Sequence, residues 1–143
     1  SDIVWNINPR YDQPDTLFVR MKRYAADMFD GKNIHSRFVF PETENGIQLS
    51  MTQRRDLYLV FKEAVNNLVK YSGAIEALVQ LSADNNQLKM LISDNGKGFD
   101  RSLVRAGNGL HNMEQRARSS GGEISISSEP GKGTKVVLEM KLG

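Results

Sequence analysis

Four polar residues between residues 52 and 71 could carry out chemistry if that segment is helical. At about 100° per residue, Glu63, Asn67 and Lys70 fall within an arc of roughly 60°, and Asp56 lies on the same stripe. A carboxylate, an amide oxygen and an ammonium on one helix face could polarise water, ligate a hard cation and contact a phosphate. The same spacing is typical of a solvated helix flank, so the stripe alone leaves both interpretations open.

A glycine-containing segment that follows an apolar run could hold a flat ligand. Asp94 comes directly after this run, and Gly96 and Gly98 follow it. An aspartate at the end of a strand can accept a hydrogen bond from an exocyclic amine, and glycines allow the backbone to approach a ligand closely. A plain turn explains the same residues equally well. A calcium loop does not, because the ligand spacing and the terminal glutamate are missing.

Two further pairs of glycines stand at the start of expected elements. Gly107 and Gly109 lead straight into a helix, whose free N–H groups could bind an anion. This segment is neither a Walker A loop nor a dinucleotide-binding fingerprint. Gly131 and Gly133 precede Thr134 at the start of the last strand, where a hairpin turn is the simpler interpretation of the pair taken alone.

The elements that must position these residues follow from periodicity and turn signals. Helices are predicted over residues 16–30, 52–71 and 110–120, and strands over 34–40, 75–83, 87–93, 124–128 and 134–142, with a short strand over 47–49. We expect Thr52 to cap the second helix and residues 84–86 to form a hairpin turn. The pattern predicts an α/β protein with about three helices on one face of a mixed, mostly antiparallel sheet.

Composition narrows the class of protein. The 143 residues suit one domain, and 39% hydrophobic with 25% charged residues is typical of a globular chain. A formal net charge of +2 does not favour nucleic-acid binding. The absence of cysteine excludes disulfides and thiolate metal sites. No apolar run reaches the roughly 18 residues that cross a bilayer, so we expect a soluble segment without membrane contact.

Taken together and in this order, the four motifs resemble the N, G1, G2 and G3 boxes of the gyrase, chaperone, histidine-kinase and mismatch-repair (GHKL) ATPase superfamily. That superfamily has the Bergerat fold, a two-layer α/β sandwich. The stretch FKEAVNNLVKYSGA is similar to the N box of bacterial two-component sensor histidine kinases. GNGLHNMEQRA resembles the subfamily whose response regulators carry LuxR-type DNA-binding domains. The resemblance extends over residues 16–142.

The resemblance implies that one group of residues binds the phosphates and a metal. Asn67 would ligate Mg²⁺, and Glu63 would act as the catalytic residue beside the metal and its water. Lys70 would contact phosphate. Gly107, Gly109 and Leu110 would bring two parts of the chain to the phosphates: the lid between Gly98 and Gly107, and the start of the helix that follows the lid.

A second group would bind adenine, according to the same resemblance. Asp94 would accept a hydrogen bond from the adenine amino group, with Thr134 assisting through water. Gly96 and Gly98 would shape the adenine pocket, and Tyr71 would line it. The implied ligands are ATP and Mg²⁺.

The resemblance also implies the place of this chain in a larger protein. Residues 1–15 would connect residues 16–143, the ATP-binding catalytic domain, to a dimerisation and phosphoacceptor domain absent from this chain. The ATP γ-phosphate would go to a histidine on that domain and then to an aspartate of a response regulator. Neither His35 nor His111 matches the acceptor motif, so we expect no autophosphorylation by this chain alone. The full-length protein would be a homodimer, with this segment on the cytoplasmic side of a membrane-bound sensor.

Two other functions stay open at this point. An anti-sigma-factor serine kinase is built on the same fold and would be a free-standing protein that binds a sigma factor. A degenerate, non-catalytic nucleotide-binding module used for docking is the other, although all four boxes are intact. The segment before Thr16 and the Lys70-Tyr71 pair favour the sensor kinase.

Overall fold

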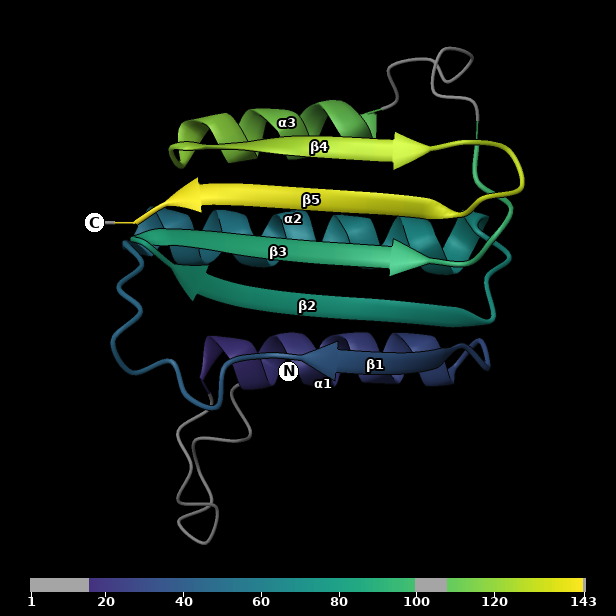
Figure 1. Cartoon of the computed structure of the whole chain (residues 1–143), viewed down its shortest axis with the longest axis horizontal. Helices are drawn as coiled ribbons and strands as arrows, with labels where there is room; N and C mark the ends of the chain where they lie inside the picture. The colour runs from purple at the N-terminus through teal and green to yellow at the C-terminus, as the bar shows by residue number, and fades with distance from the viewer. Residues whose placement is uncertain (1–15, 100–107, 143) are drawn as a thin grey trace, which may run out of the picture.

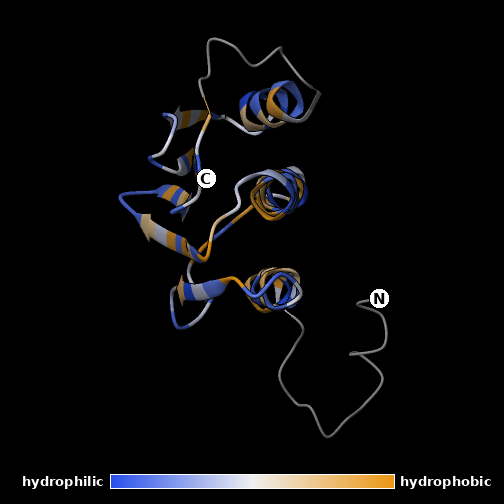
Figure 2. Cartoon of the chain, turned by 90° about the vertical axis from the view of Figure 1, so that its right-hand side faces the viewer, coloured by the Kyte–Doolittle hydropathy of each residue, from blue (hydrophilic) through white to orange (hydrophobic). Residues whose placement is uncertain are grey.

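The computed structural model describes residues 16–99 and 108–142, which form two layers (Figures 1 and 2). One layer contains three helices and the other a five-stranded sheet, so the predicted fold class is confirmed. In chain order the elements are α1 (Leu17–Asp30), β1 (His35–Val39), α2 (Met51–Tyr71), β2 (Glu76–Asp84), β3 (Gln87–Asp94), α3 (Asn108–Ser119), β4 (Gly122–Ser128) and β5 (Thr134–Lys141).

The sheet is mixed, with the strand order β1-β2-β3-β5-β4. Only the β1–β2 pair is parallel, and the other neighbours are antiparallel. The turn between β2 and β3 is confirmed. Asn85 and Asn86 have φ angles of 51° and 62° there, as a type I′ hairpin turn requires. In the register of β3 with β5, Asp94 lies opposite Thr134, so two of the expected site residues meet at one end of the sheet.

The start of α2 differs from the sequence prediction. Ser50, not Thr52, is the N-cap, because its hydroxyl accepts from the Gln53 backbone N–H at 3.1 Å. The Gln53 side chain accepts in return from the Ser50 N–H at 3.1 Å, which completes a capping box. The short strand expected over residues 47–49 is also wrong: Ile47 and Leu49 pack against the core without a strand partner.

The hydrophobic core lies between the helical layer and the face of the sheet that it covers (Figure 2). Alternate residues of β2 and β3 point into this core, and both helices α1 and α2 bury one face against it. The largest side chains that are fully buried come from both layers: Met21, Phe29, Leu57, Phe61, Leu88, Met90, Met113, Leu138 and Met140. Burial of this kind is the main term that holds the two layers together.

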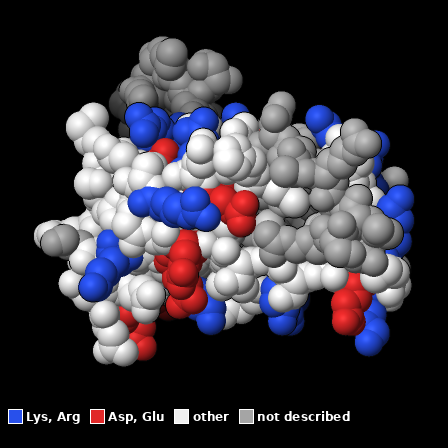
Figure 3. Space-filling model, turned by 90° about the horizontal axis from the view of Figure 1, so that it is seen from above, with Lys and Arg blue, Asp and Glu red and all other residues white. Residues whose placement is uncertain are grey.

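Two surface properties bear on function. Within the described part of the chain, none of the helices has both the length and the apolar character needed to span a bilayer. Seen from above α3 and β4, acidic and basic side chains are interspersed (Figure 3).

Candidate functional site

A cavity of about 520 Å³ opens between α2, α3 and one end of the sheet. This volume is in the range that small-molecule sites occupy in proteins. Nine residues named from the four motifs line it: Glu63, Asn67, Lys70, Tyr71, Asp94, Gly98, Gly109, Leu110 and Thr134. Gly96 lies just outside the lining, and Gly107 falls outside the described residues. Glu63, Asn67 and Lys70 of the helical stripe therefore share one cavity with residues of the glycine motifs.

The C-terminal half of α2 supplies one wall of the cavity. Glu63 and Asn67 are half-buried, whereas Lys70 and Tyr71 are exposed at the rim. The first turn of α3 packs directly against this wall. A Cβ atom built on Gly109 would lie 2.7 Å from Glu63 Oε2 and 3.4 Å from Asn67 Nδ2. A carboxylate and an amide thus converge on the backbone at the start of α3, where helix geometry leaves the N–H groups without partners inside the helix.

Asp94 lies at the opposite side of the cavity, at the end of β3. Its Oδ1 accepts from the backbone N–H of Gly96 at 2.8 Å. Burial raises the pKa of this carboxyl above its usual value, although backbone N–H groups of Gly96 and Thr134 work in the other direction. A carboxyl that is half-buried and so sparsely partnered retains acceptor capacity for a ligand.

The loop after β3 is held by a side chain that motif reasoning did not single out. Asn95 Oδ1 accepts from the backbone N–H groups of Ile75 and Glu76, at 3.0 and 2.9 Å. The Lys97 N–H donates to the Ser72 carbonyl at 2.8 Å. These bonds tie the loop to the start of β2 and the end of α2. The capacity of asparagine to satisfy backbone groups is the signal that could have identified Asn95.

Gly96 supports this site indirectly. A Cβ atom on Gly96 would lie only 2.2 Å from the carbonyl oxygen of Ser72, a backbone atom that cannot turn away. Only glycine permits such an approach. Gly96 therefore lets the loop close on the end of α2 and thereby fixes the position of Asp94.

Thr134 is held by a neighbour on β4 that sequence reasoning also missed. Its Oγ1 lies 2.8 Å from the hydroxyl oxygen of Ser128. The Ser128 hydroxyl in turn accepts from the Phe99 N–H at 2.9 Å. This chain of bonds joins the end of the β3 loop to β4 and β5, beside the cavity.

Apolar side chains from both layers form much of the lining. They are Ala64, Leu68, Ile92, Phe99, Leu110, Met113, Ile126 and Val136. An apolar wall with polar groups at two ends suits a ligand that has a flat, apolar body and a charged tail. The sequence marks most of these residues only as candidates for the core, because the same residue types fill both environments.

Three residues considered at the outset lie outside the cavity lining. Asp56 is buried beneath α3, so neither interpretation of its stripe, a solvated flank or a ligand site, describes it. His35 is exposed on β1, and His111 is exposed on the first turns of α3. In the described residues no cluster of three or more His, Cys, Asp or Glu side chains could hold a metal ion by itself.

Comparison with known proteins agrees with this fold. Residues 52–143 match the model of the histidine kinase-, DNA gyrase B-, and HSP90-like ATPases, and the chain belongs to that family. Sensor histidine kinase LiaS of Bacillus subtilis is 36% identical over 60% of this chain and 24% of its own length. A sensor-like histidine kinase of Chloroflexus aurantiacus is 30% identical over 95% of this chain and 24% of its own. The chain thus spans about a quarter of these relatives.

Solved structures of histidine kinases share the architecture. The histidine kinase domain of the blue-light activated kinase EL346 from Erythrobacter litoralis superposes with a TM-score of 0.75. It is 16% identical, and the match covers 88% of this chain and 61% of that one. Histidine kinase AdeS of Acinetobacter baumannii gives a TM-score of 0.70 at 17% identity, over 89% of this chain and 64% of its own. These similarities confirm the fold.

Proposed function

We propose that the cavity binds ATP with Mg²⁺, and that the chain is the ATP-binding catalytic domain of a two-component sensor histidine kinase. The observation that carries this proposal is the convergence of Asp94 with Glu63, Asn67 and the start of α3 on a single cavity. The curated relatives are sensor histidine kinases, which favours this function over an anti-sigma-factor kinase or a docking module.

At one end of the cavity, Asp94 would accept a hydrogen bond from the adenine amino group. One of its oxygens already accepts from Gly96, which fixes the direction of the other. Thr134 would assist beside it, and Gly98 and Tyr71 would line the adenine pocket. The apolar side chains between the two ends would pack on the faces of the ring. Adenine would thereby be positioned so that the triphosphate extends toward α2.

At the other end, the side chains of α2 would hold the phosphates. The amide oxygen of Asn67 and the carboxylate of Glu63 are hard donors, and Mg²⁺ commonly takes only one or two protein ligands beside phosphate oxygens. When bound, the cation would supply positive charge that neutralises the phosphates. Glu63 would orient the reacting group as the catalytic residue, and Lys70 would neutralise phosphate charge. Gly107, Gly109 and Leu110 would place backbone N–H groups at the phosphates.

In the full-length protein, the γ-phosphate would go to a histidine on a dimerisation domain and then to an aspartate of a response regulator. Residues 1–15 would connect that domain to residues 16–143. ATP is the phosphate donor inside cells, so the domain would act in the cytoplasm. The full-length protein would work as a homodimer, and neither nucleic acid nor lipid would be a ligand of this segment.

Calorimetry with Mg-ATP and with ADP tests the binding site. We expect saturable binding and a rise in melting temperature with nucleotide concentration. Incubation with γ-labelled ATP should label the full-length protein on histidine and leave this chain unlabelled. A chain that binds no nucleotide at millimolar concentration would refute the site, and acid-labile label on this chain would refute its role as a domain that needs a separate acceptor.

A further inference from the structure

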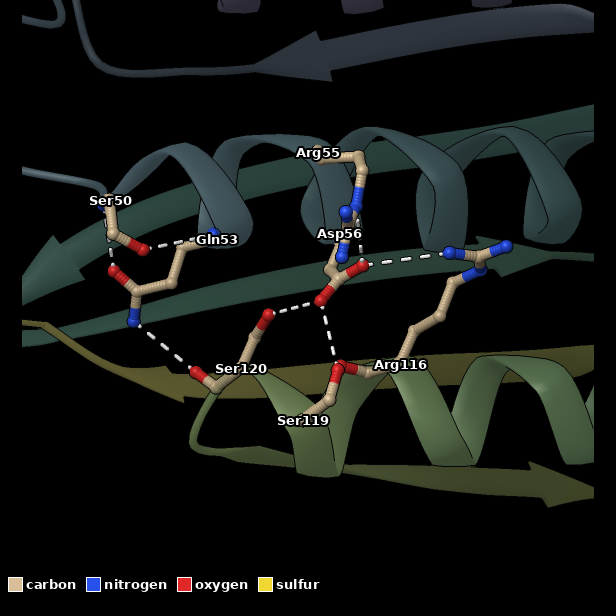
Figure 4. Close-up of polar contacts among 7 residues, drawn as sticks. All are labelled: Ser50, Gln53, Arg55, Asp56, Arg116, Ser119 and Ser120. Atoms are coloured by element: carbon tan, nitrogen blue, oxygen red, sulfur yellow. Dashed lines mark hydrogen bonds and ion pairs between the residues drawn. The ribbon is translucent and has the colours of Figure 1, made fainter.

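Helices α2 and α3 lie along each other in opposite directions, and both ends of α3 touch α2. Just past the middle of α2, Glu63 meets Gly109 in the first turn of α3. Near the start of α2, Asp56 meets Ser119 and Ser120 at the end of α3 (Figure 4). The first contact belongs to the cavity, whereas the second lies about two helical turns from it along α2.

Asp56 is fully buried, and it is the one charged residue classed as buried in the part of the chain that the structure describes. Its Oδ2 accepts from the hydroxyls of Ser119, at 3.0 Å, and Ser120, in a short hydrogen bond. Its Oδ1 lies 3.4 Å from Arg55 Nε and 3.6 Å from Arg116 Nη1. We call these five residues the carboxylate clamp. Its donors approach from both helices.

A second tie reinforces the clamp one turn earlier on α2. The side chain of Gln53 is fixed by the capping box with Ser50, and its amide NH₂ group points toward Ser120 at the end of α3 (Figure 4). Nε2 donates to the Ser120 carbonyl at 3.2 Å and to the Lys141 carbonyl at 2.7 Å. The end of α3 is therefore held by directional polar bonds to the first turns of α2.

We propose that Asp56 is a positioning residue for the nucleotide site, the fixed pivot that sets where the first turn of α3 lies against Glu63 and Asn67. This inference rests on the proposed function. Helix α3 also packs on the core through the buried apolar side chains of Met113 and Ala117, and apolar contacts fix neither tilt nor sliding as directional bonds do.

The geometry makes the first turn of α3 sensitive to this pivot. Gly109 and Ser119 are separated by about 15 Å at a rise of 1.5 Å per residue. A tilt of about 4° at the clamp would therefore move Gly109 by about 1 Å over that length. Displacements of this size at a reacting group can cost about 100-fold in rate. A small loosening of the clamp would therefore be enough to disturb how the first turn of α3 contacts the phosphates.

The test is the Asp56→Asn variant, which keeps the shape of the side chain and removes its charge. At a temperature where the variant is fully folded, we expect its affinity for Mg-ATP to fall by roughly 2- to 30-fold, the range seen for residues that act through a neighbour. Affinity for adenosine, which lacks the phosphates, should fall less. Amide hydrogen exchange should accelerate in the first turn of α3.

Glu44→Gln is the matched control. The Glu44 carboxylate is 15% exposed and also joins two elements, because it accepts from the Phe18 N–H at 3.0 Å and pairs with Arg54 of α2 at 3.4 Å. It contacts neither α3 nor the cavity lining. We expect this variant to lose stability and to keep the wild-type affinity for Mg-ATP.

The possible outcomes separate the two proposals. A wild-type chain that does not bind Mg-ATP contradicts the proposed function. Hydrogen exchange in α3 then tests the clamp by itself: it must be faster in Asp56→Asn than in Glu44→Gln. Wild-type affinity for Mg-ATP in a destabilised Asp56→Asn chain overturns the clamp alone. If Asp56→Asn does not fold, the Ser119→Ala/Ser120→Ala double variant, which leaves the carboxylate paired with both arginines, takes its place with the same expected loss.

Discussion

Two aspartates stand at different places in the fold, Asp56 between α2 and the end of α3 and Asp94 at the end of β3 beside the cavity, and the pKa values of their carboxyls differ in a way that burial alone does not predict. Asp56 has a smaller exposed fraction than Asp94, yet the pKa of Asp56 lies below the usual value. Burial acts to raise it, but the hydrogen bonds from Ser120 and Ser119 and the charge of Arg55 outweigh that cost. Asp94 is half-buried with a raised pKa, because burial outweighs its backbone donors.

The difference separates a structural carboxylate from one prepared for a ligand. At the clamp, both carboxylate oxygens of Asp56 already have donors within the protein, which makes the contact between α2 and α3 rigid. At the cavity, the carboxyl is partly desolvated but under-used, so a ligand that donates a hydrogen bond relieves a cost already present in the free protein. Substitution of Asp94 should therefore change ligand affinity with little change in stability, whereas substitution of Asp56 should lower stability and reduce affinity only indirectly, through the position of α3. The following experiments test that separation.

The largest effect is expected for Asp94→Asn. The asparagine amide has an NH₂ donor in place of one acceptor oxygen, so the adenine amino group would face another donor instead of an acceptor. Affinity for ADP should therefore fall by about 100-fold or more. Calorimetry measures this loss. The free energy of unfolding should stay near the wild-type value, because the amide oxygen can still accept from Gly96. A variant that binds ADP like the wild type would contradict the assignment of Asp94.

A large loss of stability is expected for Asp56→Ala. Removal of the carboxylate leaves the Ser120 hydroxyl without its partner in a buried site, and we expect unfolding free energy to fall by about 3 kcal/mol. Urea titration followed by circular dichroism gives this quantity. As a comparison, Asp84→Ala removes an exposed aspartate and should change stability by less than about 0.5 kcal/mol. Equal stability of the two variants would show that the clamp contributes little.

A smaller, ligand-specific effect is expected for Asn67→Ala. Loss of the amide oxygen should weaken Mg-ATP binding by about 10-fold and leave metal-free ADP binding nearly unchanged, since the side chain would contact the cation. Titrations with and without Mg²⁺ distinguish the two. The same loss in both conditions would mean that Asn67 contacts the nucleotide rather than a metal.

The smallest effects concern pH, and their signs are opposite. The pKa of Asp56 is lowered on folding, so its stabilisation is complete above about pH 4 and is lost as the pH falls through the native pKa. The pKa of Asp94 is raised, so native Asp94 holds its proton to higher pH, and stability falls as the pH rises from about 4 through that pKa. Wild type should therefore lose its advantage over Asp56→Asn in acid, while Asp94→Asn should gain on wild type above pH 4. Urea midpoints across pH 3–7 provide the check.

Much of the fold could be predicted from the sequence because its causes are local. Helical and β periodicity identified the three helices and five strands to within a few residues, and Asn85-Asn86 specified a turn that few other pairs form. The order of the four motifs likewise pointed to residues that line one cavity. The error at the start of α2 was avoidable, since Ser50 and Gln53 have the spacing of a capping box.

Only the tertiary structure decided what each point on the stripe of α2 faces. Asp56 and Glu63 are two turns apart and point in the same direction from the helix, so the sequence by itself determined their shared face and no more. Packing of α3 across α2 then covers Asp56 with hydroxyl donors and leaves Glu63 at the edge of the cavity. The apolar wall and the close approach at Gly96 were decided in the same way. Periodicity gives the direction of a side chain relative to its own helix, whereas burial and hydrogen-bond partners depend on elements that arrive from elsewhere in the chain.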